Sequence, residues 1–412
     1  MNIRAEHIDE NFAYIWFDPI LEVVKKMVDE PLVSAAKDVA KIFGDEAWES
    51  EKKRQLSDTA LAAVEDSGLF SALVPQRFGG AEIDFHIIPQ LVRELAKGDT
   101  SSAWVTAFLI HHNWQFALYP LETQEELWAE RNYALAPATL APTGRAERVD
   151  GGWKLSGRWQ WATGVMHSQW ALVTAIAAVE EVEEMALMLL PIEDVEVVDV
   201  WHTEGMRATG SNDMVITEAF VPDRRAITYR AISKREAPGQ IASSNPLYKL
   251  DMLALLSLDA TATSVGAGER SLELFTERLH ERKLMFGGQQ KDSSTAQVRL
   301  ARAASIMRSA RLMFDAAVHD LCAPLRDEPF PSPEKRVRIR MDCAHVVDLV
   351  KQGLALISDG AGATSHFLES PLQRFRRDVS TLSGHILFDY DRAAELQGQM
   401  MLGIKPPSGT LF

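Results

Sequence analysis

The stretch RVDGGWKLSGRWQWATG, residues 148–164, decides the fold class. Asp150-Gly151 lies between two short runs with the alternating pattern of strands, and an Asp-Gly pair in that place favours a tight hairpin turn. Further segments with the composition of strands follow at 170–176, 186–190 and 215–221. The middle of the chain therefore predicts a β-domain rather than a continuation of the helical pattern around it.

Apolar residues at helical spacing flank this β-domain on both sides. Before it, Gly68 is expected to end one helix, and Ser101 or Ser102 to cap another. After it, the segments with the helical period are 250–280, 296–321, 334–359 and 380–401. Long helices normally pack as a bundle. We expect an α+β fold made of the following parts: an N-terminal helical domain (1–135), a middle β-barrel or sandwich domain (136–225) and a C-terminal four-helix bundle (226–412).

The composition narrows the class of protein. The 412 residues carry a net charge of -15 without a run of basic residues, so we expect no nucleic-acid partner and no anionic membrane surface. Two cysteines, Cys322 and Cys343, fit a reducing compartment. The N-terminus lacks the apolar core of a signal peptide, and no segment reaches ~18 consecutive apolar residues. A cytoplasmic protein is expected.

Several common catalytic signatures are absent from the sequence, namely HExxH, the P-loop and the GxSxG nucleophile elbow. Gly360-Ala361-Gly362 is a lone GxG that follows a helical segment rather than a strand, so a nicotinamide site is not indicated. No metal site is indicated either, because the cysteines lack metal-type spacing. Reducing equivalents, if the reaction needs them, must come from another component.

The order of several short motifs resembles the acyl-CoA dehydrogenases over nearly the whole chain. The matching pieces are Pro75 with Gly79-Gly80 and Asp84, the segments 152–157 and 161–164, the segment 205–211 with Phe220-Val221-Pro222, Phe286-Gly287 with Leu300-Ala301, and Pro371 and Arg374 leading to Arg377-Asp378. The resemblance implies the acyl-CoA dehydrogenase fold, and it implies a homotetramer assembled through the C-terminal helices.

The catalytic base of many acyl-CoA dehydrogenases, a Glu near the last motif, has no counterpart here. Asp378 is followed by Val-Ser-Thr-Leu-Ser-Gly-His-Ile, and no carboxylate appears before Asp389. The chain instead resembles the oxygenase components of two-component flavin hydroxylases, which act on phenols and indoles. His112-Asn113-Trp114, the segment 156–159 and the pairing of Arg377-Asp378 with His385 carry this second resemblance.

This branch of the superfamily implies a specific chemistry. Reduced FMN or FAD would arrive from a separate NAD(P)H:flavin reductase and react with O2 to give a C4a-hydroperoxyflavin, which hydroxylates an aromatic substrate, indole-like or phenolic. A true FAD-dependent acyl-CoA dehydrogenase is the alternative, and a non-catalytic protein that uses the fold for binding is a third reading. The sequence leaves the choice between FMN and FAD open, because the Arg that the family usually places three residues before Phe286 is replaced by Lys283.

The resemblance also implies roles for individual residues. His112 is the expected base that takes a proton from a phenol, or a hydrogen bond from an indole N–H, since an imidazole titrates near neutrality. His111 next to it points about 100° away on a helix and is expected to have no catalytic role. His385 is expected beside the flavin, with Asp389 one helical turn later to orient its ring. Thr163 is the expected hydroxyl donor to flavin N5 or to the peroxide.

Two further groups of residues complete the expected site. Those assigned to the substrate are Trp104, Trp114 and Thr139. Those assigned to the flavin are Trp161, Thr163, Arg207, Ser211, Arg282 and Phe286. An arginine suits the flavin phosphate because its guanidinium matches phosphate geometry bidentately. A pocket rich in aromatic side chains suits the reaction because it keeps water from the peroxide.

Overall fold

The computed structural model describes residues 31–179, 182–285, 287–322 and 331–406. Its N-terminal part is helical. The helices are α3 (Pro31–Lys53), α4 (Asp58–Ser67), α5 (Ile88–Ala96), α6 (Thr100–Phe116) and α7 (Leu121–Leu127). Gly68 ends α4 in the left-handed conformation, as predicted. The predicted cap of α6 is wrong: Asp99 is the N-cap, and its Oδ2 accepts a hydrogen bond from the Ser102 N–H at 2.9 Å.

The middle of the chain forms one seven-stranded sheet in the order β5-β6-β2-β1-β3-β4-β7. The strands are β1 (Ala138–Val149), β2 (Gly152–Ala162), β3 (Trp170–Val179), β4 (Val182–Pro191), β5 (Glu196–Val198), β6 (Asn212–Pro222) and β7 (Ala226–Thr228). The predicted hairpin is confirmed, because β1 and β2 pair antiparallel with Val149 opposite Gly152. Strand β1 also pairs with β3, in parallel.

The indole of Trp159 organises the interior of the sheet. The ring is fully buried, and its Nε1 donates to the Thr174 carbonyl at 2.7 Å. Two glycines make room for it: a Cβ at Gly144 would lie 2.0 Å from the ring, and a Cβ at Gly157 would lie 2.8 Å from it. Other buried apolar residues from β1, β2, β3, β4 and β6 share this core, so the sheet encloses a core of its own. Packing of Trp159 inside the β-domain therefore explains the sequence of the segment 156–159.

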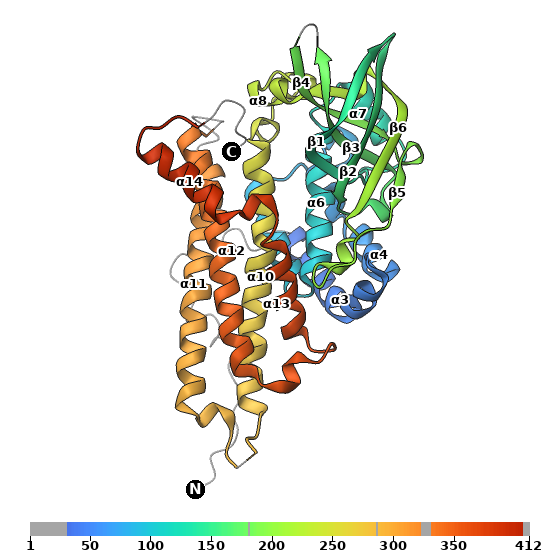
Figure 1. Cartoon of the computed structure of the whole chain (residues 1–412). Helices are drawn as coiled ribbons and strands as arrows, with labels where there is room; N and C mark the ends of the chain where they lie inside the picture. The colour runs from blue at the N-terminus through green and yellow to red at the C-terminus, as the bar shows by residue number, and fades with distance from the viewer. Residues whose placement is uncertain (1–30, 180–181, 286, 323–330, 407–412) are drawn as a thin grey trace.

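The helical part that follows begins with two short helices, α8 (Tyr229–Lys234) and α9 (Pro238–Ala242), and continues with long ones. The long helices α10 (Met252–Glu281), α11 (Ser294–Cys322) and α12 (Pro333–Ala361) confirm the first three predicted segments. They lie side by side, and the sheet stands beside the upper end of α10 in Figure 1. Helix α6 contacts α5, α10 and α13, and so lies between the bundle and the rest of the molecule.

The prediction of a single fourth helix over 380–401 is wrong. Helix α13 (Pro371–Leu382) covers only the first three residues of this range, and α14 (Tyr390–Met401) starts after a break that contains the short 3-10 helix η12 (Ile386–Phe388). Leu382, Leu387 and Phe388 are all buried, so apolar residues continue at helical spacing through a segment that is not α-helical. The spacing of apolar residues indicates which side chains are buried here, and burial alone does not require a continuous helix.

A buried carboxylate joins three helices of the structure. Glu269 on α10 lies 2.9 Å from the Arg93 guanidinium on α5, 2.8 Å from that of Arg311 on α11, and 3.4 Å from Lys97 Nζ. Burial alone would raise the pKa of Glu269, but the three cations outweigh burial and hold this pKa well below its usual value. Glu269 is therefore ionised in the folded protein, where it shares the neutralisation of these cations with Glu94 and Asp315.

Of the two cysteines, Cys322 is the last residue of α11, and Cys343 lies in the first half of α12. Cys343 is buried and Cys322 is partly buried, and both are free thiols. Burial raises the pKa of each thiol to about 12, with Asp259 and Asp84 adding to the effect at Cys322. Within the described residues, no helix is long and apolar enough to cross a membrane.

We predict that Glu269→Gln lowers the free energy of unfolding by about 3 kcal/mol, because the three cations around it then share only two carboxylates, those of Glu94 and Asp315. Urea denaturation at pH 7 measures the change. Glu273→Gln is the control, since Glu273 lies on the same helix and pairs with Arg270 near the surface. The difference between the Glu269 variant and the wild type should begin to shrink below about pH 4.5, where the unfolded carboxyl takes up a proton, and should disappear only when the pH falls below the depressed pKa of the folded carboxyl. Equal midpoints for the two variants at pH 7 would contradict this role.

Candidate functional site

Five aromatic rings from α6 and from the break after α13 form a continuous cluster. We call Trp104, Phe108, His112, His385 and Phe388 the aromatic cluster. The centroids of Trp104 and Phe108 are 4.8 Å apart, and those of Phe108 and His112 are 5.9 Å apart. Trp104 also lies 5.6 Å from His385, edge to face. The cluster thus brings two of the expected catalytic histidines to the two ends of one apolar surface.

The backbone fixes the tautomer of His112. Its Nδ1 lies 2.6 Å from the carbonyl oxygen of Ala136, which can only accept, so Nδ1 carries the proton. The Nε2 lone pair is then an acceptor, and no described residue donates to it. Burial lowers the pKa of His112 to about 3, with a smaller contribution from His111. The expectation of an imidazole that titrates near neutrality does not hold for this buried ring, which is neutral and accepts.

His385 has the opposite tautomer. Its Nδ1 accepts a hydrogen bond from the Leu387 N–H at 3.3 Å, so the proton of the neutral ring lies on Nε2. Burial lowers the pKa of His385 to about 4. The expected pairing with Asp389 is wrong, because Asp389 is the N-cap of α14 and accepts from the Arg392 N–H. In the aromatic cluster, His112 therefore offers a hydrogen-bond acceptor at Nε2, and His385 offers a donor at Nε2.

A chain of hydroxyl groups lies at the end of β2. Thr163 Oγ1 is 2.9 Å from Ser211 Oγ, and Ser211 Oγ is 2.7 Å from Thr209 Oγ1. Trp161, two residues before Thr163, has a left-handed backbone with φ of 64° and a ring that is 61% exposed. Such a conformation is strained for a bulky residue, and strained residues concentrate at functional sites. Thr163, Trp161 and Ser211 are thus brought together, as predicted for the flavin side of the site.

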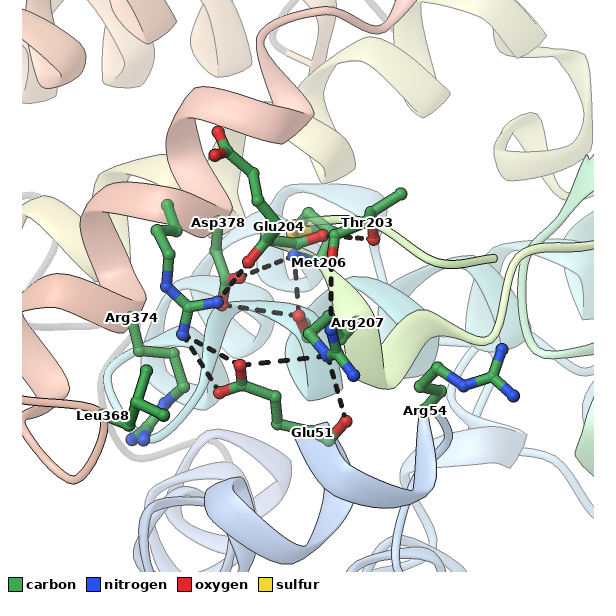
Figure 2. Close-up of polar contacts among 12 residues, drawn as sticks. Glu51, Arg54, Thr203, Glu204, Met206, Arg207, Leu368, Arg374 and Asp378 are labelled. Atoms are coloured by element: carbon green, nitrogen blue, oxygen red, sulfur yellow. Dashed lines mark hydrogen bonds and ion pairs between the residues drawn. The ribbon is translucent and has the colours of Figure 1, made fainter. Parts of the chain in front are cut away.

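Buried charged groups hold the loop that carries Ser211 (Figure 2). Asp378 Oδ1 accepts from the Met206 N–H at 2.6 Å, and Ser101 Oγ lies 3.4 Å from Oδ2 of the same carboxylate. Burial, together with the Asp99 carboxylate, raises the pKa of Asp378. Arg374 pairs with Asp99 at 3.1 Å. The arginine-aspartate motif of α13 therefore joins the bundle to the β-domain loop and to the cap of α6.

Arg207, expected at the flavin phosphate, belongs to this network. Its guanidinium donates to the backbone carbonyls of Thr203 and Glu51, at 3.2 and 3.4 Å, and lies 4.0 Å from the Glu51 carboxylate. Figure 2 shows the side chain directed at Glu51. The Glu51 carboxylate also pairs with Arg377 at 2.9 Å. These contacts give Arg207 a structural role between α3 and the loop.

Trp114 lies on the other side of α6 from the aromatic cluster. Its ring is fully buried, its Nε1 donates to the Leu247 carbonyl at 2.9 Å, and its centroid is 5.5 Å from that of His111. His111 faces α10, where Nδ1 lies 3.0 Å from Asp259 Oδ2. Burial lowers the pKa of His111 to about 3 and raises that of Asp259. His111 thus points away from His112, as expected, while Trp114 is a core residue.

Of the remaining expected residues, Arg282 lies away from the β-domain within one chain. Arg282 is the C-cap of α10, and its guanidinium donates a hydrogen bond to the Ala361 carbonyl at 3.0 Å. Figure 1 shows this end of α10 away from the sheet. Phe286 lies outside the described residues. Thr139 on β1 is buried, and its hydroxyl has no hydrogen-bond partner in the described part of the chain. A buried hydroxyl without a partner is suited to a bound ligand.

Sequence reasoning missed two parts of this arrangement. Phe108 and Phe388 complete the aromatic cluster, and the spacing of four from Trp104 through Phe108 to His112 was a signal for the first of them. Thr209 extends the hydroxyl chain, and nothing in the sequence pattern distinguishes it from an ordinary loop threonine. What the assembled residues could hold is a planar aromatic cofactor: the exposed Trp161 ring offers a stacking surface beside the half-buried Thr163 hydroxyl.

Comparisons with known proteins identify the family of this chain and agree with its fold. Residues 259–390 match the family model of the acyl-CoA dehydrogenase C-terminal domain. A pigment production hydroxylase of Rhodococcus sp. is 31% identical over 365 residues, 88% of this chain and 94% of that protein. The flavin-dependent monooxygenase oxygenase subunit HsaA of Mycobacterium tuberculosis is 31% identical over 374 residues, 89% and 94% of the two chains. XiaF from Streptomyces sp., solved with FADH2 and glycerol, superposes with a TM-score of 0.87 at 27% identity, over 95% of this chain and 100% of that one.

We predict that the free energy of unfolding falls as the pH drops from 6.5 to 4. His111, His112 and His385 are neutral in the fold, whereas the unfolded chain binds protons on them below about pH 6.5, so acid favours unfolding. Each ring contributes up to about 1.4 kcal/mol per pH unit. His112→Gln should make the slope shallower by about that amount in urea denaturation at a series of pH values. His319→Asn, at an exposed position, should not change the slope. Equal slopes in the wild type and His112→Gln would contradict the assignment.

Proposed function

Because this chain belongs to the oxygenase components of two-component flavin-dependent monooxygenases, in the acyl-CoA dehydrogenase superfamily, we propose that it hydroxylates a small aromatic compound whose ring carries an O–H or N–H group. It is an enzyme that uses reduced flavin and O2 to hydroxylate aromatics. The observation that carries the finer proposal is the neutral His112, whose Nε2 lone pair has no donor among the described residues. A phenol and an indole both supply the missing donor.

His112 acts first as an acceptor and only then as a base. With a pKa of about 3, its ring does not remove a proton from a resting phenol, whose acidity is far weaker. Attack of an electrophilic oxygen on the ring carbon makes the substrate O–H or N–H much more acidic as the reaction proceeds. His112 therefore holds the substrate by a hydrogen bond and takes the proton as positive charge develops on the substrate. Thr139, with its unpartnered hydroxyl, is proposed to bind a polar group of the same substrate.

His385 supplies the complementary group. Its Nε2–H is proposed to donate a hydrogen bond to an oxygen atom that a bound flavin would present, while Trp104 and Phe388 pack against its ring. Reduced flavin, when bound, supplies the electrons that activate O2 and the electrophilic oxygen. The apolar rings of the aromatic cluster keep water from this region, which protects the oxygen transfer from hydrolytic side reactions.

FADH2 is the proposed form of the flavin, delivered by a separate NAD(P)H:flavin reductase. XiaF, similar over nearly the whole chain, was solved with FADH2, and this supports FAD over FMN. HsaA is described as an oxygenase subunit, which supports a separate protein as the flavin reductase. Trp161 and Thr163 are proposed to contact the isoalloxazine ring, with Ser211 behind Thr163. An acyl-CoA dehydrogenase activity is not favoured, because the segment between Asp378 and Asp389 lacks a carboxylate that could remove an α-proton.

A homotetramer is the proposed assembly. One chain leaves Arg282 at the end of α10 away from the sheet, so Arg282 would reach a flavin at Thr163 only in another copy. Exposed apolar side chains on α11 and after α14 are consistent with burial against further copies. They include Val298 and Leu312 on α11 and Met401, Leu402 and Ile404 at the end of α14. The flavin site is then shared between two chains.

We predict that His112→Gln retains substrate binding but loses product. Glutamine offers an acceptor in place of Nε2 and does not take a proton, so the KM for a phenol should stay within about threefold while product per reduced flavin falls about 100-fold. The products formed from a phenol and from indole, with photoreduced FAD and O2, measure this. His319→Asn is the control. Wild-type product yield in His112→Gln would rule out His112 as the base, and absence of product from both compounds in the wild type would rule out the proposed substrate class.

The shared site makes a second prediction. Thr163→Val and Arg282→Ala should each bind reduced FAD weakly as single variants. Co-expression of the two chains should restore about a quarter of the wild-type sites, because one copy then supplies an intact Thr163 and another an intact Arg282. Size-exclusion chromatography of the co-expressed protein, followed by anaerobic flavin titration, gives the number of sites. The number of sites in the co-expressed protein could instead be no greater than the average of the two single variants. In that case either both residues belong to the site of one chain, or Arg282 does not belong to the flavin site.

A further inference from the structure

The hydroxyl chain beside Trp161 ends on a group that has no proton to give. Thr209 Oγ1 lies 2.9 Å from the Met206 carbonyl oxygen, 2.7 Å from Ser211 Oγ, and Ser211 Oγ lies 2.9 Å from Thr163 Oγ1. The same carbonyl oxygen accepts from Trp201 Nε1 at 2.9 Å and from the Thr209 N–H at 3.2 Å. A carbonyl oxygen only accepts, so it fixes the direction of every bond that leads to it.

Counting protons along the chain gives a single arrangement. Each hydroxyl has one proton. Thr209 gives its proton to the Met206 carbonyl, so Thr209 Oγ1 accepts the proton of Ser211. Ser211 Oγ in turn accepts the proton of Thr163. Thr163 therefore has no proton left for a ligand. Its oxygen, on a half-buried residue, can only accept a hydrogen bond.

We infer that Ser211 and Thr209 are positioning residues that make Thr163 a hydrogen-bond acceptor, and that this polarity selects reduced flavin over oxidised flavin. The N5 atom of reduced flavin carries a hydrogen and donates, whereas N5 of oxidised flavin has a lone pair and only accepts. An acceptor at Thr163 matches the first and opposes the second. This inference rests on the proposed function, and it reverses the role of hydroxyl donor that the sequence resemblance implied for Thr163.

The surrounding backbone keeps the chain in this direction. Asp378 holds the Met206 N–H at 2.6 Å, and Met206 has a left-handed backbone with φ of 55°, which sets the position of its carbonyl. The Gly164 N–H donates to the Thr209 carbonyl at 3.1 Å and ties the two loops together. Reversing the hydroxyl chain would leave two oxygens facing each other at the Met206 carbonyl without a proton between them, and such an unmade bond costs about 1–3 kcal/mol. The acceptor state of Thr163 is therefore built in before any ligand arrives.

The test compares the affinities of two probes, oxidised FAD and photoreduced FAD, by anaerobic titration of the full-length protein. The wild type should bind the reduced probe more tightly. Ser211→Ala frees the Thr163 proton, and Thr209→Val removes the group that orients Ser211. Each should therefore lower the ratio of the Kd for oxidised FAD to the Kd for reduced FAD about tenfold. The midpoint potential of bound FAD should fall with it, by about 30 mV for this two-electron couple. Thr209→Ser keeps a hydroxyl that can donate to Met206 and should restore both values.

Thr203→Val is the matched control, because the Thr203 hydroxyl donates to the Gly205 carbonyl in the same loop, outside the hydroxyl chain. It should leave the ratio unchanged. A ratio within twofold of the wild type in both Ser211→Ala and Thr209→Val would overturn the inference, as would failure of Thr209→Ser to restore it. If Thr209→Val does not fold, Ser211→Ala and Thr209→Ser decide the outcome. Equal affinity of the wild type for the two probes, or no binding, would count against the proposed function itself.

Discussion

The hydrogen bond from the Met206 N–H to the Asp378 carboxylate, 2.6 Å long and buried, joins the helical bundle to the sheet. It fixes a residue in the left-handed conformation at the start of the loop that leads to Ser211. The neighbouring pairs of Arg374 with Asp99 and of Arg377 with Glu51 bring the cap of α6 and the end of α3 to the same place. Since removing one member of a buried ionic network leaves its partner uncompensated, the α13 motif constrains the position of every element around the site.

The chemistry of the two histidines is set by main-chain groups. A carbonyl oxygen at Ala136 makes His112 an acceptor, and an N–H at Leu387 makes His385 a donor, although both rings are neutral. In many enzymes a carboxylate orients the catalytic imidazole and also stabilises its charged form. A backbone partner orients the ring without adding charge, so it favours neutral rings that bind substrate and oxygen by hydrogen bonds. The hydroxyl chain follows the same rule, because the Met206 carbonyl decides its direction.

The sequence allowed the order of helices and strands to be predicted, because the hairpin at Asp150-Gly151 and the long helices depend on local turn chemistry and periodicity. The faces of α6 could not be predicted in the same way. Nearly all of its residues from Thr100 to Phe116 are buried, so no polar side marks which of His111, His112 and Trp114 face the site. The break between α13 and α14 was missed because burial continues through it. The polarity at Thr163 depends on a carbonyl more than 40 residues away in the chain, which no local pattern encodes.

The high pKa of the two thiols has a consequence for an enzyme that handles activated oxygen. Flavin oxygenases that lose their oxygen before transfer release hydrogen peroxide, and peroxide attacks cysteine through the thiolate. With a pKa of about 12, Cys322 and Cys343 are thiolates in only about one molecule in 10⁵ at pH 7. Burial that serves the packing of α11 and α12 therefore also disfavours the oxidation of these two thiols by peroxide.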